Sequence, residues 1–211
     1  MTQTFSSRLV APTEIAQRTA LAVRAGGVAI FPTDTVYGIG CDPASEAAVE
    51  RIFAAKRRPL YKPLSLHFAE VEELLAYATR TPLLERAARA FLPGPLTLIV
   101  ARPASLGSFV TRGLETVGLR VPKHALCSAI LRATGPLAAT SANLSGNPAY
   151  TGTGLVTGLP DADVVVLDGP TQLRAESTVI DVTGPRPRLV REGAITLAML
   201  GEILGTIEVP V

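Results

Sequence analysis

The apolar positions along the chain follow helical spacing in some segments and form short strand-like runs in others. Helical spacing with capping or breaking residues predicts helices at 13–25, 42–57, 71–77, 82–91, 125–133 and 197–204. Short apolar runs between turn residues predict strands at 28–31, 64–68, 96–101, 117–121, 137–139, 163–167, 178–182 and 188–191. Interleaved elements of this kind favour an α/β or α+β fold, a twisted mixed sheet with helices packed on it.

Turn and cap residues set the expected boundaries. Gly26-Gly27 should end the first helix, and Asp42-Pro43 should begin the second, with Asp as N-cap and Pro at the first helical position. The segment PTDTVYGIG at 32–40 is expected to be a loop. No internal repeat or linker-like stretch interrupts the chain, so we expect residues 1–211 to form one domain.

Composition narrows the class of protein. With 47% apolar residues and a net charge of +2, the chain should fold and offers no bulk electrostatic case for nucleic-acid binding. Apolar runs such as 164–167 fall far short of the ~20 residues of a membrane span, and residues 1–12 hold no apolar signal core. We therefore expect a cytoplasmic protein that does not associate with a membrane. Two cysteines support neither a disulfide framework nor a zinc site.

The distribution of positive charge is more informative than its sum. The chain has 20 Lys and Arg residues, of which three are lysines, and two of these three lie in the segment KRRPLYK at 56–62. A solvated helix end would explain such a cluster, because cations favour a helix C-terminus. Pro59 and Pro63 instead indicate a stiff loop, and a stiff cationic loop suits the oxygens of a phosphate chain. Both interpretations remain open at this point.

Polar loops follow the apolar strands, where ligands bind in open α/β sheets. They carry neither GxGxxG nor GxxxxGK[ST], and nothing resembles the GxSxG of a serine nucleophile. Singly, their residues are ambiguous. The turn around Asp34 fits an ordinary β-turn, and His67 in LSLHF fits a core residue with one satisfied nitrogen. Arg120, inside an apolar strand, must point to solvent or reach a buried anion, because unpaired burial is too costly.

Seven short motifs, taken in order, resemble the YrdC/TsaC family of threonylcarbamoyl-AMP synthases. They are PTDTVYG (32–38), KRRPLYKPLS (56–65), LPGPLT (92–97), TVGLRVP (116–122), ATSANLSG (139–146), STVID (177–181) and REG (191–193). The resemblance spans about residues 13–204 and implies a YrdC-like fold with a concave ligand-binding surface. At this length the chain resembles the family's short, single-domain form rather than its longer members.

The resemblance implies a reaction in which L-threonine, bicarbonate and ATP give L-threonylcarbamoyl-adenylate and pyrophosphate. A transferase complex would then pass the threonylcarbamoyl group to tRNA beside the anticodon, and direct tRNA contact is a further possibility that the resemblance raises. In this chemistry the nucleophile is the carbamate of threonine, so no covalent catalytic residue is expected. The protein must supply position and charge stabilisation, normally with Mg²⁺ on the phosphates.

Motif matching implies two sets of site residues. Those expected to contact ATP are Lys56, Arg58, Lys62, Thr116, Ser141, Asn143 and Arg191. Those expected to contact L-threonine are Thr35, His67, Arg120, Ala139 and Ser177, with Ala139 offering only backbone groups. Arg120 is the expected bidentate partner of the threonine carboxylate. One departure from the family's motifs is Ala149, where many family members have a serine. The motifs identify no metal ligands.

Two alternatives belong to other classes. A non-catalytic RNA-binding module of the same fold would need a broad basic face, whereas the net charge of +2 with clustered cations favours a small anionic ligand. A carbamoyl-transfer domain of the hydrogenase-maturation type would be longer and carry cysteine-rich zinc motifs, against the two cysteines present.

Overall fold

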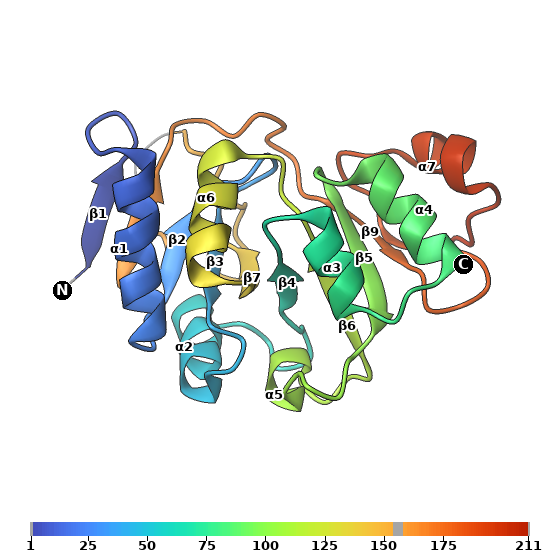
Figure 1. Ribbon diagram of the computed structural model, residues 1–211, viewed down its shortest axis with the longest axis horizontal. Helices are drawn as coiled ribbons and strands as arrows, with labels where there is room; N and C mark the ends of the chain where they lie inside the picture. The colour runs from blue at the N-terminus through green and yellow to red at the C-terminus, as the bar shows by residue number, and fades with distance from the viewer. Residues whose placement is uncertain (1, 154–157, 211) are drawn as a thin grey trace.

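The computed structural model describes residues 2–153 and 158–210, whose strands form one ten-stranded sheet (Figure 1). The strands are β1 Gln3–Ser6, β2 Ala29–Phe31, β3 Gly38–Cys41, β4 Ser65–His67, β5 Leu96–Ala101, β6 Thr116–Arg120, β7 Leu137–Ser141, β8 Val164–Leu167, β9 Thr178–Asp181 and β10 Arg188–Arg191. Their order across the sheet is β1-β8-β2-β3-β7-β4-β6-β5-β9-β10.

Parallel and antiparallel pairs are mixed within this sheet. The pairs β1–β8, β2–β8, β4–β6 and β5–β9 are parallel. The pairs β2–β3, β3–β7, β4–β7, β5–β6 and β9–β10 are antiparallel. The prediction of a mixed sheet with helices packed on it is confirmed.

The helices among the described residues are α1 Pro12–Arg24, α2 Glu46–Lys56, α3 Val71–Tyr77, α4 Pro82–Phe91, α5 Ser108–Thr111, α6 Ala125–Thr134 and α7 Leu197–Leu204. None of them is both long and apolar enough to cross a membrane. Figure 1 shows α1 and α6 side by side over the strands of one half, and α3, α4 and α7 at the other half.

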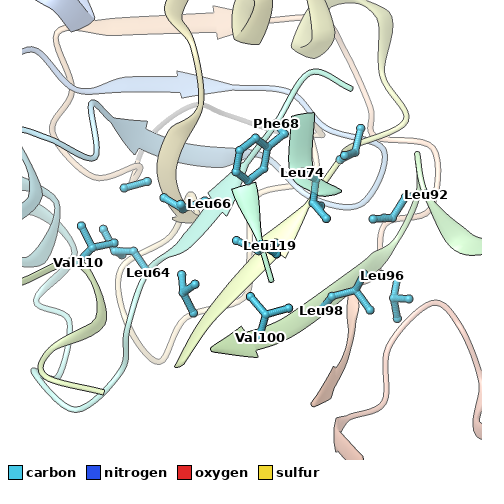
Figure 2. Packing of buried hydrophobic residues seen from close by; sticks show 14 of the residues in the cluster. Leu64, Leu66, Phe68, Leu74, Leu92, Leu96, Leu98, Val100, Val110 and Leu119 are labelled. Carbon is cyan, nitrogen blue, oxygen red and sulfur yellow. The ribbon is translucent and has the colours of Figure 1, made fainter. Parts of the chain in front are cut away.

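Two buried clusters hold the helices to the sheet. On one face, Phe31 of β2 packs with Ile15 of α1 and Ile130 of α6. On the other, Ile30 of β2 packs with Ile52 of α2, because successive side chains of a strand point to opposite faces. The second cluster continues into the other half of the molecule. There Leu66, Leu98 and Leu119 of neighbouring strands meet Leu74 of α3 and the residues around it (Figure 2).

Most predicted elements are present, and the second helix begins later than predicted. Asp42 is not its N-cap: the Asp42 carboxylate accepts from the backbone N–H of Ala44 at 2.8 Å and so closes a turn. Ser45 caps α2 instead, and its hydroxyl accepts from the N–H of Ala48 at 3.2 Å. The helix also runs to Lys56, so the cationic segment 56–62 begins on a helix end rather than wholly in a loop.

The prediction of a loop at 32–40 is wrong at its C-terminal end, which enters β3. Two glycines of that strand, Gly38 and Gly40, lie against the ring of Phe31, where an added Cβ would approach to 3.1 Å. The strand therefore needs glycine at those positions and shows no apolar alternation in the sequence. The short elements β1 and α5 are also absent from the predicted set.

Candidate functional site

One cavity of about 540 Å³ is lined by all twelve candidate residues. They come from separate parts of the chain: the turn after β2, the end of α2 and the loop that follows, strands β4, β6 and β7, and the segments that flank β9 and β10. Strand order explains the convergence, because β7, β4 and β6 are neighbours and β9 lies two strands beyond β6. The sheet thus brings into one cavity candidate residues that are spread over more than 150 positions of the sequence.

Lys56 closes one side of the cavity and is itself only 1% exposed. Its ammonium donates to the carbonyl of Ser141, to the carbonyl of Asn143 at 2.5 Å and to Asn143 Oδ1 at 3.3 Å. Burial, reinforced by the charge of Arg58, lowers the pKa of Lys56 to about 7. All three of its hydrogen bonds go to the end of β7 and the loop after it, so Lys56 holds that loop in place.

The same loop is tied together by its own side chains. Ser141 Oγ donates to Asn143 Oδ1 at 2.6 Å. The Asn143 amide nitrogen donates to the carbonyls of Leu144 at 3.0 Å and Asn147 at 2.7 Å. Together with Lys56, these bonds give the cavity a preformed polar wall.

Arg58 and Lys62 form the cationic edge of the cavity. Arg58 donates to two carbonyls of its own loop, through Nε to Lys62 at 3.0 Å and through Nη2 to Pro63 at 2.9 Å. Burial lowers the pKa of Arg58 to about 10, so its guanidinium stays charged at neutral pH. Lys62 is exposed, and its ammonium lies 5.9 Å from the centre of the Tyr61 ring. Arg58 thus fixes the loop that presents Lys62.

Arg120, which lines the cavity, forms a buried ion pair with Asp34. Arg120 Nη2 lies 2.6 Å from Asp34 Oδ1, and the two residues are 4% and 2% exposed. Arg120 Nε donates to the carbonyl of Gly94 at 3.2 Å. Burial lowers the pKa of Arg120, and the Asp34 carboxylate opposes that shift. Arg120 therefore reaches a buried anion supplied by the protein, one of the two positions that the sequence leaves open.

This pair alters how Arg120 can meet a ligand. The expected bidentate contact would use two donors of the guanidinium, but Nε and Nη2 are already engaged. Nη1 remains, without a hydrogen-bond partner among the described residues, on a side chain that lines the cavity. A single charge-assisted hydrogen bond from Nη1 is the contact that this geometry offers to a carboxylate.

His67 lies beside Arg120, because β4 and β6 pair these two residues directly. Its ring meets Phe31 edge to face at 6.2 Å between ring centres. Burial and the neighbouring charge of Arg120 lower the pKa of His67 to about 3, so the imidazole is neutral. Nδ1 is buried without a partner among the described residues, so the expected satisfied nitrogen is not Nδ1.

Hydroxyl groups of Thr33, Thr35, Ser65, Thr97 and Ser177 form part of the cavity lining, here called its floor. Thr33 and Thr35 are 3.0 Å apart through their hydroxyls, and Thr97 and Ser177 are 2.9 Å apart. The hydroxyl of Ser65 donates to the backbone carbonyl of Ala139, at 3.2 Å. The backbone oxygen expected of Ala139 is thus already an acceptor. A floor of this kind can orient a small polar ligand through many neutral hydrogen bonds.

Arg191 and Glu176 complete the wall near the cations. Arg191 donates to the carbonyl of Ser177 through Nη2 at 2.8 Å and Nε at 3.2 Å. Its Nη1 donates to Glu176 Oε2 at 2.6 Å. Glu176 is the one carboxylate in the lining formed by the described residues, and those residues contain no group of three or more potential metal ligands.

Sequence reasoning misses four lining or supporting residues: Asp34, Ser65, Thr97 and Glu176. Asp34 has the pattern of a turn residue, although an acid just after a buried strand could be matched with the arginine inside another. Glu176 stands directly before the predicted Ser177, and no spacing signal marks it.

The two cysteines offer no reactive thiolate in this site. Cys41 and Cys127 are free and buried. Burial raises the pKa of Cys41 to about 12 and also raises the pKa of Cys127.

Comparison with known proteins identifies relatives of this chain. Residues 21–193 match the family model described as "Telomere recombination", which covers Sua5, YciO and YrdC proteins. A threonylcarbamoyl-AMP synthase of Pyrococcus abyssi is 38% identical over 191 residues, which cover 89% of this chain and 56% of that protein. A threonylcarbamoyl-AMP synthase of Bacillus subtilis is 41% identical over 203 residues, 93% of this chain and 58% of that protein. The chain spans little more than half the length of these two relatives.

A solved structure extends the comparison to the fold. The crystal structure of Pyrococcus abyssi Sua5 complexed with L-threonine superposes with a TM-score of 0.88 at 34% identity, covering 100% of this chain and 62% of that one. With most of its length matched by the family model, this chain belongs to the Sua5/YciO/YrdC family.

Proposed function

We propose that this protein is an L-threonylcarbamoyladenylate synthase, which converts L-threonine, bicarbonate and ATP to threonylcarbamoyl-AMP and pyrophosphate. The observation that carries the proposal is the cavity of about 540 Å³, which joins a cationic edge, a hydroxyl-lined floor and a buried arginine. The names of its relatives and the threonine-bound neighbour support the same reaction. By class the enzyme would be a nucleotidyltransferase acting on N-carboxy-threonine.

The phosphates of ATP would lie at the cationic edge. Arg58, Lys62 and Arg191 line it, and a phosphate chain needs several charge-assisted donors. Thr116, Ser141 and Asn143 would contact the nucleotide from the neighbouring strand and loop. Lys56 would act through the loop that it holds. Mg²⁺ would enter with ATP, as part of the substrate, and neutralise part of its charge.

L-threonine would lie toward Arg120. Its carboxylate would accept from the remaining donor, Nη1, while neutral His67 and the hydroxyls of Thr35 and Ser177 would hold its polar groups. Ala139 would add backbone contact at the strand end. Because these groups face the same hollow as the cations, the amino acid and the α-phosphate of ATP would meet within it.

The chemistry then needs no nucleophile from the protein. The threonine amine attacks bicarbonate, water leaves, and the resulting carbamate oxygen attacks the α-phosphorus while pyrophosphate departs. The protein holds the two reactants together and stabilises the charge that develops on the phosphates. The adenylate would next serve a transferase complex that modifies tRNA.

Pyrophosphate release tests this proposal directly. The purified chain should release pyrophosphate only when ATP, L-threonine and bicarbonate are all present, and the labelled carbon of bicarbonate should appear in the nucleotide product. Arg58→Ala should abolish most of that release, while Arg18→Ala, on the exposed surface of α1, should not. RNA binding without any threonine-dependent turnover would favour the binding-module alternative instead.

A further inference from the structure

Glu176 places a carboxylate in the cavity where we propose that the phosphate chain of ATP binds, so the residue and the ligand have the same sign of charge. Its side chain lines the cavity and pairs with Arg191 at 2.6 Å, with exposed fractions of 44% and 45% for the two side chains. Half-exposed ion pairs are weak, because water competes for both partners and each side chain loses freedom on pairing. This pair can therefore open and close at small cost in free energy.

The carboxylate also faces the other cations of the wall. Its negative charge acts to raise the pKa of Lys56 and of Arg58, against the lowering that burial imposes on both. The charge of Arg191, by contrast, acts to lower the pKa of Arg58. Three cations thus converge on one side of the cavity, and Glu176 is the group that offsets their mutual repulsion.

Arg191 does not depend on Glu176 for its orientation. Its Nε and Nη2 are fixed by the backbone carbonyl of Ser177, and Nη2 also lies 3.2 Å from the Ser177 hydroxyl. Only Nη1 is committed to the carboxylate. If Glu176 turns away, Arg191 stays in place and presents Nη1 to another anion.

We propose that Glu176 is a built-in counter-anion, which occupies the position of a phosphate group beside Arg191 and thereby limits how tightly the cavity holds a phosphate chain. This inference rests on the proposed function, from which it takes one element: that the ligand of the cavity is a phosphate chain. An incoming triphosphate displaces the carboxylate from Arg191. After the reaction, the return of Glu176 to Arg191 competes with bound pyrophosphate and assists its departure.

The test is the affinity of the full chain for inorganic pyrophosphate, measured by titration calorimetry without magnesium. Glu176→Gln keeps an oxygen that can accept from Arg191 and removes the charge. It should bind pyrophosphate about tenfold more tightly than the wild type, with a smaller gain for orthophosphate, because the repulsion scales with the charge of the ligand. The gain should shrink as salt is added. Glu176→Ala should change affinity in the same direction.

Glu72→Gln is the matched control, because it removes one carboxylate from the surface ion pairs with Arg80 and Arg89 and lies outside the cavity lining. It should leave pyrophosphate affinity unchanged. Unchanged or weaker binding in Glu176→Gln would overturn the inference while leaving the proposed function intact. A loss of pyrophosphate affinity in Glu176→Gln that is seen only when Mg²⁺ is present would also overturn the inference, because it would indicate that Glu176 is a metal ligand. Failure of the wild type to bind pyrophosphate or nucleotide would remove the phosphate site, and the proposed function with it.

Discussion

The ion pair between Asp34 and Arg120 is the most consequential buried contact of the site. The atoms lie 2.6 Å apart, and the side chains of Arg120 and Asp34 are only 5% and 2% exposed, so neither charge is solvated without its partner. Arg120→Met would leave a buried carboxylate, and Asp34→Asn would leave a buried guanidinium. Removing one partner of a buried pair costs ~3–5 kcal/mol. For a chain of 211 residues, this corresponds to a fall in melting temperature of roughly 6–20 °C.

The double variant, which combines Asp34→Asn with Arg120→Met, isolates the interaction. With both charges removed, no unpaired ion remains in the site, so we expect the double variant to be more stable than Arg120→Met alone. The coupling free energy should reach about 2 kcal/mol or more. Urea unfolding of the wild type, the two single variants and the double variant at neutral pH measures it. Additive losses, with coupling below ~0.5 kcal/mol, would refute the paired arrangement.

Ligand binding separates the structural role of this pair from recognition. Asp34→Asn keeps the guanidinium, so the folded protein should still bind L-threonine with an affinity near that of the wild type. Arg120→Met should weaken threonine binding at least tenfold and spare nucleotide binding, because losing a hydrogen bond to a charged group costs ~1.5–3 kcal/mol. Equal loss of affinity for both ligands would remove Arg120 from the threonine site.

The remaining predictions concern the cations and His67. Arg58→Ala should weaken binding of a non-hydrolysable ATP analogue by ~10–100-fold. Lys62→Ala should weaken it by less, because Lys62 is exposed. Unchanged affinities in calorimetry would contradict the assignment of these two residues to the phosphates of ATP. Because the pKa of Lys56 is lowered to about 7, nucleotide binding at pH 8 should take up protons, which titrations in buffers of different ionisation enthalpy detect. The unfolded chain binds this proton up to its ordinary pKa of 10.5, so the Lys56 contribution to stability rises with pH between about 7 and 10.5, and Lys56→Met should lose that slope. His67, with a pKa of about 3 against 6.5 unfolded, should favour the unfolded state as pH falls below 6.5, and its ring signals in NMR spectra should not titrate between pH 5 and 8.

The sequence could predict that several site residues share a sheet, because they stand in or directly after predicted strands. It could not predict how the strands run: β4 is parallel to β6 and antiparallel to β7, so Arg120 and Ser141 end their strands at opposite edges. The cavity is lined instead by residues paired across these strands, such as His67 with Arg120 and Ser65 with Ala139. The assignment of these residues to ATP or threonine stays a prediction.

The partners of these residues could not be predicted, because they are set by contacts distant in sequence. Lys56 binds a loop 85 residues away, and Arg120 meets an acid 86 residues away. A motif indicates that a cation is present but not that its donors are already engaged. Strand β3 is missed for a local reason: its alternate glycines accommodate Phe31 and leave no hydrophobic pattern to detect.

A crystal structure with a non-hydrolysable ATP analogue and L-threonine bound together tests the central claim most directly. We expect both ligands in the one cavity, with the phosphate chain against Arg58 and Arg191 and the threonine carboxylate at Arg120 Nη1. Nucleotide bound elsewhere on the chain, or threonine bound away from Arg120, would contradict it.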